Sequence, residues 1–271
     1  MALLGRMLAV SIPDTVLEDK ESPREKTAKL GLIARACATY GVDVIEVFGD
    51  RRGKGDVDAI RTVLEYLETP QYLRRRLYPI DEMLKYAGIL PPLRIPSHKA
   101  RVPAHTLSPG ETREGVVNED GTVDIGLDAN PRLRGTAIPG KRVTVRVVSV
   151  RPLEAEPIAK ENVRGYWGYS VESRSSAEVL YDKRFKVKIA TSRLGSPLKE
   201  ALGRLQEALS MADGVKLIFG SPSKGLFDIF GQGLSRQVDF VLNLYPEQHV
   251  ETVRTEEAIF AGLNLVSILT A

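Results

Sequence analysis

The sequence predicts an α/β protein whose parallel sheet is interrupted by an inserted antiparallel β domain. Near the N-terminus, apolar runs alternate with helical patterns, which is typical of strand–helix–strand units. From about residue 91, short alternating runs separated by turn residues replace this pattern for about 90 residues, and the α/β pattern then returns. We therefore expect a discontinuous α/β domain over residues 1–92 and 182–271 and an inserted domain over 93–181.

The first α/β unit begins with the apolar run 7–13, which predicts a buried strand. The segment Ser22–Glu25 then supplies an N-cap serine, a first-turn proline and a capping-box glutamate, so a helix is expected to begin there. Gly41 is suited to end this helix, directly before a second apolar run at 42–49. An amphipathic pattern at 56–70 predicts another helix, which its final proline stops.

The inserted segment is expected to form a small barrel of about five antiparallel strands. Residues 113–117 and 122–127 flank an acidic turn and predict a hairpin, and 141–150 is a strongly alternating strand. The aromatic run 165–173 adds a further strand. An OB-like fold, a fold that often binds oligonucleotides, is the first expectation, and the aromatic side chains either stack on bases or pack the barrel core.

After the insert, three apolar strands are each followed by a loop, and a helix closes the chain. This last helix is apolar on nearly its whole surface, so part of it is expected to meet a partner subunit. The expected elements are strands at 184–192, 215–220 and 238–245 and helices that begin at Ser196, near 225 and at Thr255.

Composition indicates an ordinary globular protein of 271 residues with a small net charge of +3. The single cysteine, Cys37, excludes an internal disulfide and fits a reducing compartment, so a cytoplasmic location is expected. The first 16 residues carry no cationic leader with a cleavage site, and no apolar run reaches the length of about 18 residues that a membrane span needs. No membrane association is expected.

Several common kinds of site are excluded by their motifs. Gly220 and Gly225 match the glycines of a phosphate-binding P-loop, but Leu226 and Phe227 stand where a lysine and a serine or threonine are needed. The chain lacks a complete dinucleotide fingerprint and a nucleophile elbow. The three histidines are not at metal-ligand spacing, so no metal site is expected.

The most basic stretch lies between residues 70 and 101, with seven lysines and arginines against two acids. Such a stretch can follow an RNA phosphate backbone. Alternatively, its arginine triplet belongs to a solvated helix face or pairs with acids one or two turns earlier. The candidate RNA-binding residues are Arg74, Arg75, Arg76 and Arg101.

Three loops follow the three C-terminal strands, at 191–195, 220–226 and 244–257. In an open parallel sheet, ligands bind beyond the carboxyl ends of the strands. The three loops are therefore expected to line one pocket.

The third loop carries the most specific motif, Thr252–Ala258, which leads into the apolar last helix. This motif resembles the last motif of the SPOUT, or α/β-knot, methyltransferases, in the archaeal and eukaryotic branch that has an inserted OB-like domain. The similarity extends over nearly the whole chain, through residues 33–48, 64–79, 86–93, 113–117, 166–171, 219–226 and 254–259.

The resemblance implies a trefoil knot in the C-terminal half, a homodimer formed through the knot and last helix, and S-adenosylmethionine bound in the three loops. An RNA substrate, either rRNA or tRNA, methylated on a base or on a ribose, is favoured by the OB-like insert and by the basic stretch from Arg74 to Arg101. Small residues in these loops would let the backbone approach the cofactor. The implied cofactor-binding residues are Thr191, Ser192, Gly220, Ser221, Pro222, Gly225, Gln248, Thr252, Val253, Arg254 and Thr255.

Methyl transfer from a sulfonium requires alignment and, for a poor nucleophile, removal of a proton. Glu256 is a candidate base or orienting carboxylate. Arg254, Arg193 and Arg24 are candidates for stabilising a developing anion, with phosphate contact or a structural ion pair as the alternative for each. Arg193 also departs from the family pattern, in which an acidic and then a basic residue often precede the loop glycine, here Gly195.

Two other functions remain open at this stage. A protein arginine methyltransferase of the same fold would be favoured by an acidic surface on the insert. A non-catalytic RNA-binding protein would be favoured by failure to bind S-adenosylmethionine.

Overall fold

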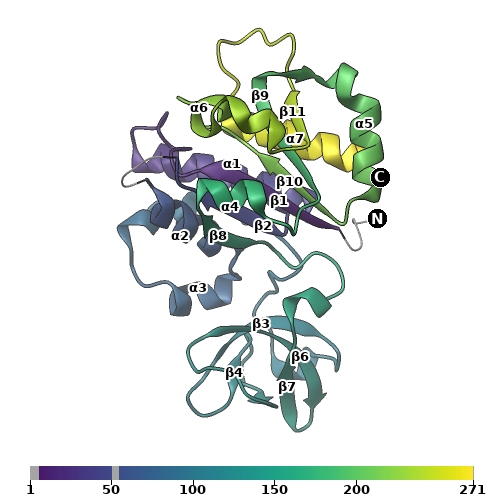
Figure 1. Cartoon of the computed structure of the whole chain (residues 1–271). Helices are drawn as coiled ribbons and strands as arrows, with labels where there is room; N and C mark the ends of the chain where they lie inside the picture. Colours follow the sequence, from purple (N-terminus) through teal and green to yellow (C-terminus); the bar gives the residue numbers. More distant parts are fainter. Residues whose placement is uncertain (1–5, 51–54, 271) are drawn as a thin grey trace. The chain divides into compact units, whose positions relative to one another are not determined.

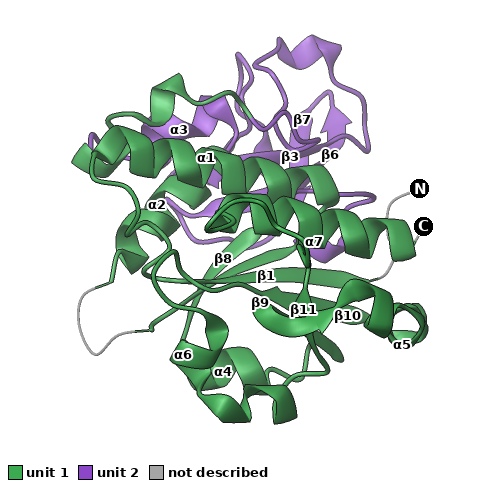
Figure 2. Cartoon of the chain, turned by 90° about the horizontal axis from the view of Figure 1, so that it is seen from above, with its two compact units in different colours: residues 1–67, 82–92, 169–271 green, residues 68–81, 93–168 purple. Residues whose placement is uncertain are grey.

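The computed structural model describes residues 6–50 and 55–270 (Figure 1). Residues 1–5, part of the N-terminal stretch in which no leader is expected, lie outside the described residues. The chain divides into two compact units (Figure 2). Unit 1 contains residues 1–67, 82–92 and 169–271, and unit 2 contains residues 68–81 and 93–168.

Unit 1 is built on a six-stranded sheet in the order β11-β9-β10-β1-β2-β8, and every neighbouring pair of strands is parallel. The central strands β1, β2 and β10 are buried almost along their whole length, as expected for strands covered on both faces. The strands are β1 (Met7–Pro13), β2 (Val44–Phe48), β8 (Ser170–Arg174), β9 (Val187–Pro197), β10 (Gly214–Ile218) and β11 (Phe240–Asn243).

Helices cover both faces of this sheet. Helices α1 and α7 pack side by side on one face, and α4 and α6 cover the other (Figure 2). The predicted start and end of α1 are confirmed: the Ser22 hydroxyl accepts a hydrogen bond from the Glu25 N–H, and Gly41 adopts a φ of 71°. The helices are α1 (Pro23–Tyr40), α2 (Val57–Glu68), α4 (Ser176–Tyr181), α5 (Leu198–Met211), α6 (Leu226–Phe230) and α7 (Thr255–Leu269).

Unit 2 contains a five-stranded sheet in the order β4-β3-β6-β7-β5. The predicted hairpin between β3 and β4 is confirmed, and an isolated bridge between Thr122 and Arg132 connects the two outer strands, so the sheet closes on itself. One pairing, between β5 and β7, is parallel. The elements are α3 (Gln71–Leu77), β3 (Thr112–Val117), β4 (Val123–Asp124), β5 (Arg132–Leu133), β6 (Arg142–Val150) and β7 (Leu153–Pro157).

The aromatic run 165–173 differs from its prediction as a strand of the inserted domain. Its strand, β8, pairs in parallel with β2 and forms the edge of the sheet in unit 1. Trp167 remains in unit 2, where its ring is buried and its indole N–H donates to Glu114 Oε1 at 2.6 Å. Because Trp167 and Tyr169 are buried, these two rings pack in the interior and are unavailable for stacking on bases.

Candidate functional site

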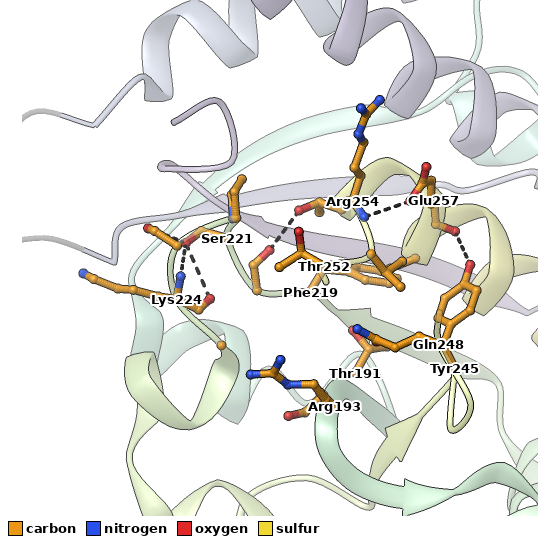
Figure 3. A pocket seen from close by; sticks show the side chains of 18 of the residues that line it. Thr191, Arg193, Phe219, Ser221, Lys224, Tyr245, Gln248, Thr252, Arg254 and Glu257 are labelled. Carbon is orange, nitrogen blue, oxygen red and sulfur yellow. Dashed lines mark hydrogen bonds between the residues drawn. The ribbon is translucent and has the colours of Figure 1, made fainter. Parts of the chain in front are cut away.

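The three predicted loops line one cavity of about 980 Å³ in unit 1 (Figure 3), although the first of them, 191–195, lies within β9 and not beyond it. All eleven residues that the resemblance implies for the cofactor border this cavity. The predicted convergence of the loops at the carboxyl end of the sheet is therefore present in the structure.

Side-chain hydrogen bonds connect the loops to one another. The Thr191 hydroxyl donates to the Ile218 carbonyl at 3.2 Å, and the Thr255 hydroxyl donates to the Gly220 carbonyl at 3.3 Å. The Asn243 amide donates to the Arg193 carbonyl at 3.1 Å, which joins the end of β11 to the first loop. These bonds fix the walls of the cavity relative to one another.

The loop after β10 is tightly curled around Gly220. The Ser221 N–H donates to the Lys224 carbonyl at 2.9 Å, and the Lys224 N–H donates back to the Ser221 hydroxyl at 3.0 Å. A Cβ atom on Gly220 would lie 2.8 Å from the Lys224 carbonyl oxygen. Because any side chain would open this turn, glycine is required for the loop to present its backbone to the cavity.

The N-terminus of α7 borders the cavity, and the helix begins at Thr255 as expected. Arg254 occupies the N-cap position, and Thr255 is the first helical residue. The Glu257 carboxylate accepts the Arg254 N–H at 2.9 Å, and the Tyr245 hydroxyl donates to the Glu257 carbonyl at 3.1 Å. Burial, helped by the charge of Glu257, raises the pKa of Tyr245, so this hydroxyl stays protonated as a donor.

Two of the four candidates for catalysis, Arg193 and Arg254, line the cavity. Neither guanidinium has an acidic partner among the described residues. The Arg193 side chain points into the cavity, whereas the Arg254 side chain extends outward (Figure 3). The geometry therefore gives Arg193 access to a bound molecule and leaves Arg254 at the rim.

The other two candidates, Glu256 and Arg24, do not line the cavity. The Glu256 side chain is only 7% exposed and its carboxylate lies 3.4 Å from the ammonium of Lys29 on α1. Arg24 is exposed in the first turn of α1. The structure thus places Glu256 in an interior ion pair, away from any molecule held by the three loops.

Four polar or charged residues that line the cavity lie outside the predicted loops: Asp19, Lys20, Asp228 and Asn243. Asn243 ends β11, so the rule that ligands lie beyond strand ends could have indicated it. Asp19 and Lys20 lie between β1 and α1, and only the position of β1 in the centre of the sheet brings them to the cavity.

The four candidate RNA-binding arginines, all in unit 2, differ in their side-chain contacts. The Arg74 guanidinium donates to the Thr69 carbonyl at 2.9 Å, and Arg76 donates to the Val117 carbonyl at 3.3 Å and lies 3.8 Å from Asp124. Two residues of the set, Arg75 and Arg101, are exposed and have no side-chain partner in the described part of unit 2.

Within residues 6–50 and 55–270, no cluster of three or more His, Cys, Asp or Glu side chains is arranged to hold a metal ion. None of the helices there combines the length and apolar character that crossing a membrane requires.

Comparison with known protein families identifies the chain. Residues 7–266 match a family model described as "Putative RNA methyltransferase". The chain belongs to this family. Its membership confirms the sequence-based prediction of an RNA methyltransferase, and S-adenosylmethionine is the methyl donor that such a family implies.

Curated relatives of this RNA methyltransferase family include an uncharacterized protein of Halobacterium salinarum, 34% identical over 96% of this chain and 98% of its own. The human 28S rRNA (uridine-N(3))-methyltransferase is 30% identical over 94% of this chain and 76% of its own. Among solved structures, the SpoU methyltransferase AviRb of Streptomyces viridochromogenes, in complex with AdoMet, matches with a TM-score of 0.39 and 9% identity. That match covers 97% of this chain and 58% of the AviRb chain.

Proposed function

We propose that the protein methylates N3 of a uridine in large-subunit ribosomal RNA, with S-adenosylmethionine as the methyl donor. The observation that carries this proposal is the three-loop cavity with the unpaired Arg193 pointing into it. The choice of atom and RNA is supported by the similarity to the human 28S rRNA (uridine-N(3))-methyltransferase, which extends over 94% of the chain.

The cavity fits the cofactor in size and in the character of its walls. Its volume of about 980 Å³ lies at the upper end of the range for cofactor sites. The close turn at Gly220 exposes backbone groups that can hydrogen-bond an adenine edge, and Thr255 anchors that turn to α7. When bound, S-adenosylmethionine would supply a methyl group on a positively charged sulfur. This sulfur would be the leaving group for an in-line attack on the methyl carbon by the acceptor nitrogen.

The residues of the cavity suit an acceptor that becomes negatively charged. The N3 of uridine is nucleophilic only after its proton leaves, and the resulting charge lies largely on the two flanking carbonyl oxygens. The Arg193 guanidinium can donate to such an oxygen, and the positive end of α7 adds to the potential. Two of the carboxylates that line the cavity have backbone partners: Asp228 accepts the Gly225 N–H at the start of α6, and Glu257 accepts the Arg254 N–H at the start of α7.

The unit 2 surface is proposed to hold the RNA through an OB-like barrel. Arg75 and Arg101 are the phosphate-binding residues in this proposal because both are exposed and have no partner in the described part of unit 2. Arg74 and Arg76 instead help to hold α3 and β4 in place through their hydrogen bonds and ion pair within unit 2.

The finer features of the family prediction are kept as part of the proposal. They are a trefoil knot in the C-terminal half, a homodimer through the knot and α7, and a cytoplasmic location. The knot is supported by β9 and β11, which pair over two registers separated by a shift, and by Gly195, where a Cβ would lie 2.7 Å from the Val241 carbonyl oxygen. The dimer is supported by the exposed apolar side chains Leu32 on α1 and Ile268 on α7.

The test uses unmodified large-subunit rRNA transcripts, S-adenosylmethionine and nucleoside mass spectrometry. We expect 3-methyluridine at one position, and an Arg193→Ala variant that makes it about 100-fold more slowly while still binding the cofactor. Arg236→Ala, an exposed arginine outside the cavity, is the matched control and should act like wild type. Methylation of a protein arginine instead, or of a ribose hydroxyl, would contradict the proposal.

A further inference from the structure

Two residues that line the cavity come from none of the three loops or their helices. Asp19 and Lys20 lie in the segment between β1 and α1, which borders the cavity beside the loop that follows β10. The Ser223 hydroxyl of that loop donates to Glu18, so the segment and the loop are joined. If the three loops hold the cofactor, this segment supplies a wall for a second molecule.

The Lys20 ammonium has N–H donors that can bind that second molecule. This ammonium lies 2.8 Å from the Asp19 carboxylate, which is its only side-chain partner in the described part of the chain. An ammonium group carries three N–H donors, so donors remain for a ligand. The Lys20 side chain is 19% exposed, and Lys20 is one of the residues that line the cavity.

A buried charge network holds this pair in position. The Lys29 ammonium, on a side chain only 1% exposed, lies 2.7 Å from Asp19 and 3.4 Å from Glu256 in the first turn of α7. Partial burial acts to raise the pKa of Asp19, but hydrogen bonds and charges from Lys20 and Lys29 outweigh it, and the net pKa is lowered. Asp19 therefore stays ionised at neutral pH and keeps Lys20 beside the cavity.

We propose that the segment between β1 and α1 binds the nucleobase that accepts the methyl group. In this site, the Lys20 ammonium donates to a carbonyl oxygen beside N3 of the uracil ring. Asp19, Lys29 and Glu256 are positioning residues that act through Lys20. This inference rests on the proposed function. It also gives Glu256 a role different from that of a base, because its carboxylate contacts Lys29 and does not reach the cavity.

The chemical consequence concerns the N3 proton. When that proton leaves to solvent, the electron pair stays on the ring and is shared with the two carbonyl oxygens. A cation held against one oxygen stabilises this anion, so it lowers the pH at which the anion forms. The other charged groups near Lys20, or lining the cavity with it, are Glu18, Glu25, Lys29, Glu256, Arg193, Lys224, Asp228, Glu251, Arg254 and Glu257.

The first experiment compares Lys20→Met with Lys26→Met. Lys26 is matched because it also pairs with an aspartate, Asp56 at 3.1 Å, but lies outside the cavity. Single-turnover methylation of an rRNA transcript is followed across pH, and cofactor affinity is measured by calorimetry. For Lys20→Met we expect a rate about 100-fold lower at neutral pH and a rate–pH midpoint about one unit higher, with cofactor affinity unchanged.

Two further variants test the role of the charge. Lys20→Arg should keep the wild-type midpoint because it keeps the cation, whereas Glu256→Gln should keep the acidic limb of the rate–pH curve. If Glu256 were a general base, its substitution by glutamine would remove that limb. A loss of the limb, or an unchanged midpoint in Lys20→Met, would overturn the assignment.

A more acidic substrate gives an independent readout. RNA that contains 5-fluorouridine has a more readily ionised N3, so the deficit of Lys20→Met should shrink on it. An equal deficit on both RNAs, or a loss of cofactor affinity in Lys20→Met, would overturn the assignment of Lys20. Absence of 3-methyluridine with the wild-type protein would instead overturn the proposed function itself, so the two failures are distinguishable.

Discussion

At the scale of single residues, the cavity depends on backbone proximity at Gly220. A Cβ there would lie 2.8 Å from the Lys224 carbonyl oxygen, so Gly220→Ala must open the turn after β10. We expect the affinity for S-adenosylmethionine, measured by calorimetry, to fall at least about tenfold, or about 1.4 kcal/mol. The thermal unfolding midpoint should change little, because the turn lies beyond the carboxyl end of β10, outside the paired part of the sheet.

The matched control is Gly203→Ala on α5, where an added Cβ would meet no atom within 4 Å. This change should raise the free energy of unfolding by about 0.5–1 kcal/mol, because alanine restricts the unfolded chain and favours the helix. It should leave cofactor affinity unaltered. Normal cofactor binding by Gly220→Ala would show that the turn is not part of the cofactor site.

At the scale of elements, one guanidinium joins three segments of unit 2. Arg142 on β6 donates at 2.6 Å both to Glu114 on β3 and to Glu68, the first residue of unit 2. Both carboxylate side chains are only 4% exposed. Arg142→Met should therefore lower the free energy of unfolding of unit 2 by about 3–5 kcal/mol at neutral pH, because two buried carboxylates lose their partner.

The pH dependence of that variant provides a second check. Burial already raises the pKa of Glu68, and loss of the opposing charge of Arg142 raises it further. A folded-state pKa above the unfolded value means that stability is lost as pH rises, so the deficit should shrink as pH falls toward the ordinary glutamate value of 4.5. Arg146→Met, which breaks an exposed pair on the same strand, should change stability by less than about 1 kcal/mol. Circular dichroism melts across pH measure both variants.

The elements also show what the sequence could and could not predict. The start of α1 at Ser22 and its end at Gly41 depend on neighbours a few residues away, so local patterns were sufficient. Strand β8 was assigned to the wrong sheet because its partner, β2, lies more than a hundred residues earlier. The same limit applies to the cavity: its three predicted segments were found from the ends of apolar runs, whereas Asp19 and Lys20 reach it only through the order of strands in the sheet.

At the scale of the whole molecule, exposed apolar side chains on unit 1 support the proposed homodimer. Ile268 on α7 is 65% exposed, which is costly in water for an isolated chain. Ile268→Glu should shift the monomer–dimer equilibrium at least about tenfold toward monomer, because it would bury a charge in the interface. Ile138→Glu, at an equally exposed isoleucine of unit 2, should not. Light scattering over a concentration series distinguishes them, and a wild-type monomer at micromolar concentration would contradict the dimer.

The order of strands in unit 1 has a consequence for synthesis on the ribosome. Strand β1 is synthesised first. The residues that pair with it in β10, such as Gly214 opposite Met7, are synthesised much later. Unit 2, complete at residue 168, can fold on the nascent chain during this interval. The cavity needs the loops on both sides of β11 and the start of α7, so it forms only when translation is nearly finished. We therefore expect a chain truncated before α7 to contain unit 2 without the complete cavity.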